Sequence, residues 1–151
     1  MSDEQLVQME IREIQIAEDL REIPVVILVE VGGFRHFPIF MGHFEANALE
    51  DSAFTADGKT VSPHSRPLTH DFIVNILNDL EASPIRVVIP RLENDTYYGE
   101  LEIKSSAGSI VRVDCRPSDA MVLATKLQIP IYVEENVLAQ VASDLPENPP
   151  E

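Results

Sequence analysis

The chain has 151 residues, of which 44% are hydrophobic, and it carries a net charge of −15. This length suits one domain with a hydrophobic core and is too short for two. No apolar run reaches the roughly 18 residues of a membrane-spanning helix, and the charged start MSDEQ is unlike a signal peptide. The sequence therefore predicts a soluble, cytoplasmic protein without a membrane partner. Its single cysteine, Cys115, excludes an internal disulfide.

The acidic charge is concentrated at the two ends of the chain. Residues 1–30 hold eight acids and two bases, and residues 134–151 hold five acids and no base, so residues 31–133 are only mildly acidic. Affinity for nucleic acid comes largely from Lys and Arg at phosphates, and no cluster of basic residues with interleaved aromatics occurs. The charge by itself disfavours a nucleic-acid partner, although it does not exclude one at the middle of the chain.

The first half of the chain predicts strands followed by one helix. Apolar residues alternate over 7–16 and change phase near Arg12 and Glu13, which indicates a bulged strand. A continuous β-branched run predicts a buried central strand, and a Gly-Gly pair predicts a tight hairpin. The elements predicted after the first strand are a strand over 23–29, a hairpin at Gly32 and Gly33, a return strand over 35–40 and a helix from 42 to about 53.

Polar residues over 55–65 predict a mobile loop, and the second half then mixes helices with strands. Phe72, Ile76 and Leu80 recur at helical spacing, with Thr69 as the expected N-cap. The later predictions are strands over 85–90 and 96–103 joined by a turn at 93–95, a hairpin at 105–108, a strand over 110–113, a helix beginning at Pro117, a strand over 131–133 and a short helix through 137–141.

These elements do not alternate regularly between strand and helix. They predict an α+β fold, in which a mixed, mostly antiparallel sheet carries three to four helices within a single domain over 1–140. The acidic, Pro-rich residues 141–151 predict a disordered tail.

The helix beginning at Pro117 offers the first candidate site. Asp114, Arg116, Ser118 and Asp119 come together where a strand ends and a helix begins. Two carboxylates there could hold a hard divalent cation, while Arg116 and the helix N-terminus orient a phosphate. The alternative is structural: a capping acid and an Arg–Asp pair that only stabilise a helix start.

Two further helix starts carry similar groups. His70 could act as a general base or metal ligand and Asp71 could share the same cation, but a Thr cap followed by an acid is also an ordinary helix start. Gly42, His43 and Glu45 form the third start. These residues could complete a metal site if the three helix starts converge, which the spacing permits without requiring it.

Three ordered motifs resemble the bifunctional nuclease family, once called DUF151, over roughly residues 7–138. The motifs are VVILVEVGGFRHFPIFMGHFEANAL over 25–49, RPLTHD over 66–71 and DCRPSDAMVLATKLQIPIYV over 114–133. The resemblance implies an α+β fold, a tendency to form homodimers, and nuclease activity on both DNA and RNA.

The motif residues yield a specific hypothesis. We expect a nuclease of low sequence specificity that depends on Mg²⁺ or Mn²⁺. The candidate side chains are His70, Asp71, Arg116 and Asp119 for catalysis, Arg66 and Ser118 for substrate binding, and Asp71, Asp114, Asp119 and Glu45 for the metal. The alternatives are a non-catalytic domain that binds an anion or a partner protein at its helix N-termini, and a structural dimer.

Overall fold

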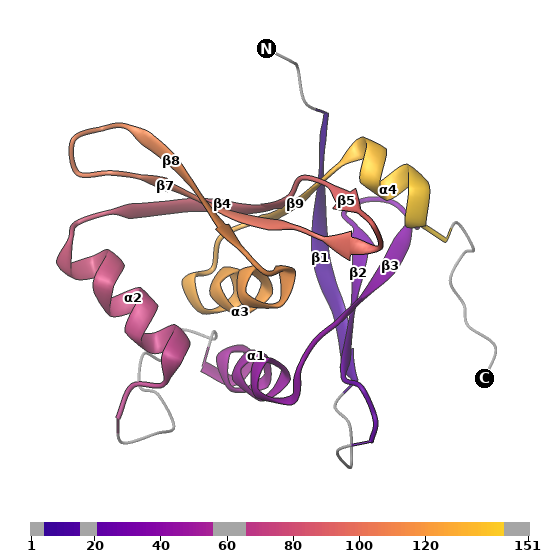
Figure 1. Ribbon diagram of the computed structural model, residues 1–151, viewed down its shortest axis with the longest axis horizontal. Coiled ribbons are helices and arrows are strands. Elements are labelled where there is room, and N and C mark those ends of the chain that lie inside the picture. Colours follow the sequence, from indigo (N-terminus) through magenta and orange to yellow (C-terminus); the bar gives the residue numbers. More distant parts are fainter. Residues whose placement is uncertain (1–4, 16–20, 56–65, 144–151) are drawn as a thin grey trace.

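The computed structural model describes residues 5–15, 21–55 and 66–143. It contains a seven-stranded mixed sheet in the order β3-β2-β1-β9-β4-β7-β8, a two-stranded sheet and four helices (Figure 1). This architecture confirms the predicted α+β class. The elements are β1 (Leu6–Gln15), β2 (Val25–Glu30), β3 (His36–Phe40), α1 (His43–Thr55), α2 (Thr69–Asp79), β4 (Ser83–Ile89), β5 (Leu92–Glu93), β6 (Thr96–Tyr97), β7 (Gly99–Lys104), β8 (Ile110–Cys115), α3 (Pro117–Leu127), β9 (Ile131–Glu134) and α4 (Glu135–Val141).

All neighbouring strands of the large sheet are antiparallel except β4 and β9, which are parallel. The predicted bulge in the first strand is confirmed, because the β1–β2 register shifts between Ile11 and Glu13. The hairpin between β2 and β3 is also confirmed, with Gly32 at a φ of 78°, a conformation that glycine adopts without strain.

Helix α3 connects β8 to β9, as the strand, turn and helix pattern predicts. Strands β8 and β9 run in the same direction but are separated by β7 and β4, so the connection passes beneath two strands. Residues 120–124 of α3 are all buried, and the small side chains of Ala120 and Ala124 let other elements approach closely. Helices α1, α2 and α3 lie on one side of the sheet (Figure 1).

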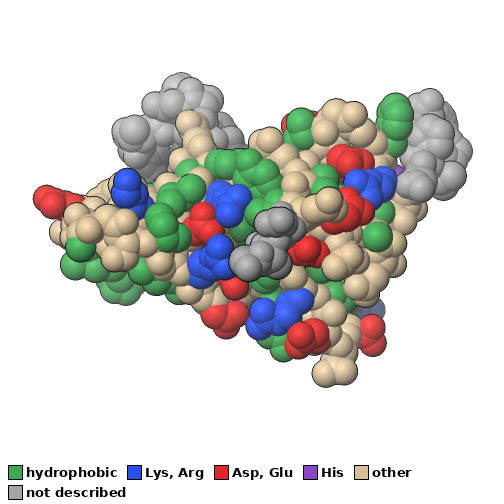
Figure 2. Space-filling model, turned by 90° about the horizontal axis from the view of Figure 1, so that it is seen from above, with side chains coloured by type: hydrophobic (Ala, Val, Ile, Leu, Met, Phe, Trp, Pro, Cys, Tyr) green, Lys and Arg blue, Asp and Glu red, His purple; other side chains and the backbone are tan. Residues whose placement is uncertain are grey.

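On the opposite face of the sheet, none of the described helices lies above β4, β7 and β8 (Figure 1). Viewed from that side, basic and acidic side chains are interspersed over the surface (Figure 2). This pattern fits an antiparallel sheet with one buried and one solvated face. Within residues 5–15, 21–55 and 66–143, no helix has the length and apolar character needed to cross a membrane.

Some boundaries differ from the sequence predictions. Helix α2 has Leu68 as its N-cap instead of Thr69, because Asp71 accepts the Leu68 N–H at 3.0 Å and supplies the cap one residue earlier. Ile23 precedes β2 and is 66% exposed. The turn at 93–95 joins the separate ladder of β5 and β6, and not β4 directly to β7. Residues 56–65 of the predicted loop and 144–151 of the predicted tail lie outside the described residues.

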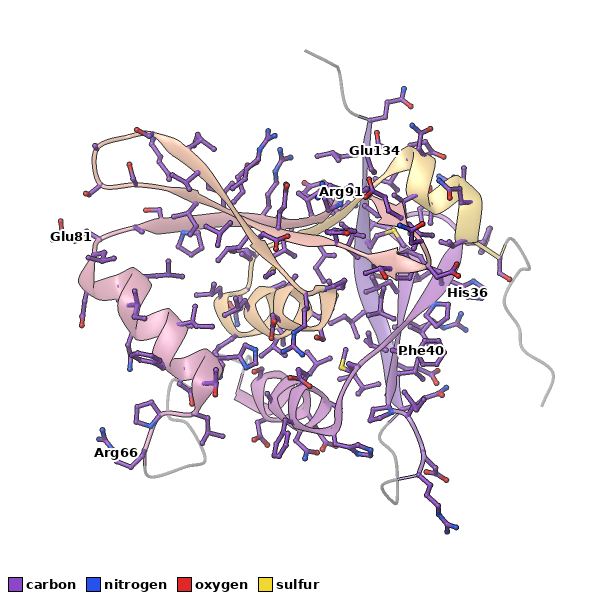
Figure 3. All side chains as sticks on the ribbon, viewed as in Figure 1. His36, Phe40, Arg66, Glu81, Arg91 and Glu134 are labelled. Atoms are coloured by element: carbon purple, nitrogen blue, oxygen red, sulfur yellow. The ribbon has the colours of Figure 1, made fainter. Side chains whose placement is uncertain are left out.

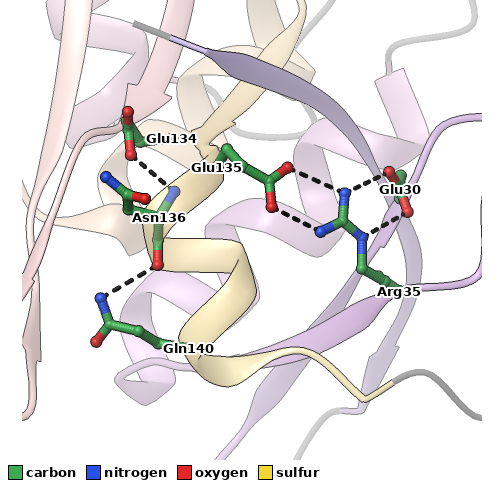
Figure 4. A network of polar contacts seen from close by, with 6 residues as sticks. All are labelled: Glu30, Arg35, Glu134, Glu135, Asn136 and Gln140. Carbon is green, nitrogen blue, oxygen red and sulfur yellow. Dashed lines mark hydrogen bonds and ion pairs between the residues drawn. The ribbon is translucent and has the colours of Figure 1, made fainter.

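Arg35 ties the β2–β3 hairpin to α4. Its guanidinium donates to both oxygens of Glu30 and to both oxygens of Glu135, at 2.8–3.1 Å (Figure 4). Hydrogen bonds from Arg35 lower the pKa of Glu30 and the pKa of Glu135. A second contact stabilises the same helix, since Glu134 accepts the N–H of Asn136 at 2.8 Å as its N-cap (Figure 4).

Replacing Arg35 by glutamine is expected to destabilise the protein by about 1–2 kcal/mol at pH 7, because two carboxylates are left facing each other. In the folded state, the pKa of each acid lies below its ordinary value of 4.5. The ion pairs with Arg35 therefore stabilise the fold fully above pH 4.5, and this stabilisation is lost as the pH falls through the folded-state pKa values. Thermal unfolding of wild type and R35Q between pH 7 and pH 3 measures the stability difference between the two proteins. The stability difference should shrink below about pH 4.5.

The matched control is Arg91→Gln, which removes an exposed arginine 3.5 Å from Glu93. Arg91 also lies over the ring of Tyr98, 4.3 Å from its centroid, but contacts of a half-exposed arginine with one carboxylate and one ring contribute little, so R91Q should change the melting temperature less than R35Q does. A stability difference for R35Q that stays constant across the pH range would contradict the role given to the two glutamates.

Candidate functional site

Side chains from the starts of three helices meet in one polar cluster. Glu45 lies in the first turn of α1, His70 at the second position of α2, and Asp119 in the first turn of α3, whose N-cap is Arg116. We call these four residues the helix-start cluster. Their three helix starts converge, as the sequence permitted without requiring it.

Arg116 and Asp119 form the local part of the helix-start cluster. Arg116 has extended backbone angles (φ −76°, ψ 151°) and is followed by Pro117, which favours the first position of a helix. Its Nε donates to Oδ2 of Asp119 at 2.9 Å, and its Nη2 donates to Oδ1 at 3.0 Å. This bidentate geometry fixes the guanidinium plane.

His70 approaches the same carboxylate from α2. The residue is buried, at 7% exposed, and its Nε2 lies 2.9 Å from Oδ1 of Asp119. Asp119 therefore receives hydrogen bonds from two helices that are far apart in the sequence. The remaining ring nitrogen of His70, Nδ1, is the atom left to exchange a proton with another group.

Glu45 completes the helix-start cluster from α1. Its Oε2 accepts from Nη2 of Arg116 at 2.7 Å, so the guanidinium is held between two carboxylates. A Cβ added at Gly42 would collide with the carboxylate of Glu45. The glycine thus leaves room for Glu45 to fold back over the start of α1 and reach Arg116.

The ionic contacts keep the helix-start cluster charged. Burial alone would raise the pKa of Asp119, but hydrogen bonds from Arg116 and His70 outweigh burial and hold that pKa below its ordinary value. The two carboxylates raise the pKa of Arg116. Burial, together with the charges of Asp119, Asp114 and Glu100, raises the pKa of Cys115 to about 12, so this thiol stays protonated at neutral pH.

A groove of about 490 Å³ lies beside the helix-start cluster. One wall is the start of α3, with Arg116, Pro117 and Ser118, and the other walls come from the β3–α1 connection and the β5–β6 turn. The side chain of Arg116 is 63% exposed despite its two ion pairs. Arg116 is thus the member of the cluster that a dissolved ligand meets first.

Residues 26–146 match the sequence profile of the bifunctional nuclease domain. The chain belongs to this family. Two relatives come from Mycobacterium tuberculosis and are named only as uncharacterized proteins, MT1877 of strain CDC 1551 / Oshkosh and Rv1829 of strain ATCC 25618 / H37Rv. Each is 37% identical to this chain over 124 residues, which cover 82% of this chain and 70% of the relative.

The remaining predicted site residues of this bifunctional nuclease domain are not members of the helix-start cluster. Asp71 accepts from the Leu68 N–H and pairs with Lys126 of α3 at 2.7 Å, so it joins α2 to the last turn of α3. Asp114 is exposed on β8, opposite Glu100 of β7. Ser118 is buried at 6% exposed and lines the groove. Arg66 is exposed before α2 and points away from the other helices (Figure 3).

The fit of a divalent cation can be tested on these contacts. Both oxygens of Asp119 accept from Arg116, Glu45 pairs with Arg116, and Asp71 pairs with Lys126. Among the residues that the structure describes, no three His, Cys, Asp or Glu side chains are grouped so that they could hold a metal ion. In this arrangement the described side chains do not form a Mg²⁺ or Mn²⁺ site, and the metal requirement stays a prediction.

Sequence reasoning missed the residues that the β5–β6 turn brings to the groove, namely Asp95, Thr96 and Tyr97. They looked like an ordinary hairpin. Tyr97 reaches the groove because its ring stacks on Phe37 of β3, with ring centroids 5.7 Å apart. Nothing in the local sequence signals this contact, since it joins segments sixty residues apart.

Proposed function

We propose that this bifunctional nuclease domain hydrolyses phosphodiester bonds in DNA and RNA with low sequence specificity, at the helix-start cluster. The family supports the reaction class. The observation that carries the location is Arg116, an arginine fixed by two carboxylates and yet 63% exposed beside a groove.

Arg116 is suited to a phosphate because it is both oriented and available. Its Nε and Nη2 are used by Asp119 and Glu45, and Nη1 has no hydrogen-bond partner within the described part of the chain. Nη1 is therefore free to donate to a phosphate oxygen, and the fixed guanidinium stabilises the negative charge that develops on the phosphoryl oxygens in the transition state. Asp119 and Glu45 act as positioning residues.

His70 is the proposed base. With Nε2 held by Asp119, Nδ1 accepts a proton from the attacking water while the water oxygen forms a bond to phosphorus. The bond from phosphorus to the leaving oxygen of the sugar breaks on the opposite side, that oxygen takes a proton from solvent water, and His70 releases its proton to solvent. Asp119 stays ionised and stabilises the imidazolium that forms in between. Ser118, in the groove, and Arg66, before α2, are the proposed substrate contacts.

A non-catalytic domain is the second candidate, and one observation favours it. The hydrogen bonds within the helix-start cluster join the starts of three helices, so the cluster also suffices as a structural link, and the net charge of −15 repels a polyanion. In that case the exposed edge of Arg116 binds a small anion or a partner protein and no turnover occurs.

Cleavage assays on single-stranded RNA and plasmid DNA decide between the two candidates. Arg116→Gln should lower kcat/KM by about 10²- to 10³-fold, because one fixed donor to the developing charge is lost. Each protein is assayed with Mg²⁺, with Mn²⁺ and with EDTA, so the metal requirement is measured in the same experiment. The control is Arg91→Gln, which removes an arginine of similar exposure, 47%, away from the groove.

Equal activity of wild type and Arg116→Gln would mean that another protein in the preparation cleaves the substrate, and the anion- or partner-binding function would then be preferred. Loss in Arg116→Gln with full activity in Arg91→Gln supports the nuclease. We also propose that the domain works as a homodimer in the cytoplasm, with nucleic acid as its substrate. The single cysteine fits a reducing compartment.

A further inference from the structure

Strand β8 is an open edge of the large sheet. It is the last strand in the order, and no strand within the described residues pairs with its outer side. Residues 110–114 are all exposed, and Ile110, Val111 and Val113 are 53%, 44% and 42% exposed. An exposed edge rich in β-branched residues is a template for a further strand.

The charges on β8 are arranged unevenly. Arg112 and Asp114 are two residues apart and therefore share the face of the sheet that no helix covers. Arg112 lies opposite Glu102 of β7 and donates Nε to it at 3.3 Å. Asp114 lies opposite Glu100, a like charge that destabilises a cross-strand pair, and no cation pairs with Asp114 in the described part of the chain.

We propose that a second copy of this chain adds to this edge, with β8 antiparallel to the partner's β8 and Val113 opposite the partner's Val113. This surface rests on the proposed homodimer and specifies its interface. In this register Arg112 faces the partner's Asp114, and Asp114 faces the partner's Arg112, so each edge carboxylate gains the cation that it lacks. A two-fold interface must be self-complementary in this way.

The two-fold axis restricts the possible registers. In an antiparallel pair, residues that lie opposite each other point to the same face of the sheet. Two identical strands related by a two-fold axis can therefore pair only when one residue at the axis lies opposite its own copy in the partner. Centring on Arg112 places two arginines against each other, which is unfavourable. Centring on Val113 forms two Arg–Asp pairs on the open face. On the other face of the sheet, the same register places Val113 opposite the partner's Val113 and Val111 opposite the partner's Cys115. The exposed valines are then covered.

The first test measures oligomeric state by light scattering on a sizing column. Wild type should be a dimer, and Asp114→Lys should be a monomer. The variant is informative because the introduced lysine would face Glu100 favourably within its own chain while facing the partner's Arg112 unfavourably. It should therefore still fold as a monomer, which its circular dichroism spectrum checks, although it loses the stability that dimer formation adds. A wild-type monomer at all concentrations, or a D114K dimer as stable as the wild type, would overturn the proposal.

The second test fixes the register by disulfide trapping in a Cys115→Ser background. Opposite Cα atoms are roughly 4.5–5.5 Å apart, within disulfide range. Val113→Cys should give a covalent dimer under mild oxidation, whereas Val111→Cys and Arg112→Cys should not. Trapping at 111 or 112 in place of 113 refutes the register, and trapping at none of them refutes the interface. Neither test measures cleavage, so a failed nuclease assay leaves both readouts intact.

Discussion

Replacing His70 by glutamine should lower kcat/KM for single-stranded RNA by about 10²- to 10⁴-fold, the usual contribution of a positioned acid or base. Glutamine can still donate an N–H to Oδ1 of Asp119, so the contact between α2 and α3 is kept. It cannot take up a proton at neutral pH. The loss should therefore fall on turnover, and the affinity for the uncleaved strand, measured by fluorescence anisotropy, should change little.

The matched control for this variant is His36→Gln. His36 is the first residue of β3, at the opposite end of that strand from Phe40 and α1 (Figure 3), and its Nδ1 lies 3.1 Å from the carbonyl oxygen of Phe34. Its replacement should leave kcat/KM unchanged. If His70→Gln retains wild-type turnover and also melts normally, His70 serves only as a buried link between two helices, and the proposed base must be sought elsewhere.

Replacing Phe37 by alanine should cost about 3–5 kcal/mol of the free energy of unfolding, the largest stability effect that we expect in this chain. Phe37 is fully buried on the inner face of β3 and stacks on Tyr97, which lines the groove. The substitution leaves a cavity between the large sheet and the β5–β6 turn. Urea unfolding should show a lower midpoint with an unchanged slope.

Phe40→Ala provides the comparison on the same strand. Phe40 points to the other face and is 63% exposed, so its truncation should change stability by less than about 0.5 kcal/mol. Equal losses of unfolding free energy in the two variants would mean that Phe37, stacked on Tyr97, stabilises the protein no more than the exposed Phe40 does.

Much of the fold was predictable because its signals are local. The alternating residues of β1, the Gly pair before β3 and the Pro at the start of α3 each act within a few residues of chain. The N-cap of α2 was wrong by one residue, since the carboxylate of Asp71 caps Leu68 and makes a Thr cap unnecessary. The order of strands could not be predicted, because pairings such as β1 with β9 join segments more than a hundred residues apart.

The sequence predicts which residues form the candidate site, but not which of their side chains contact each other. Sequence motifs pointed to all four residues of the helix-start cluster, but the partner of each side chain depends on tertiary packing. Lys126, which pairs with Asp71, lies at the far end of α3, and no local signal marks it as a partner of α2. Strand alternation turned Asp114 to the open face, away from Asp119, although the two are close in sequence.

Strand β9 joins the two halves of the seven-stranded sheet. It is only four residues long, yet it is the only described strand that pairs with both β1 and β4. Before residues 131–134 have been synthesised, strands β1–β3 and strands β4, β7 and β8 can form only two separate antiparallel sheets, each with an additional open edge. A ribosome must therefore release most of this chain before its two halves can close, and until then both halves expose edges that other nascent chains could pair with.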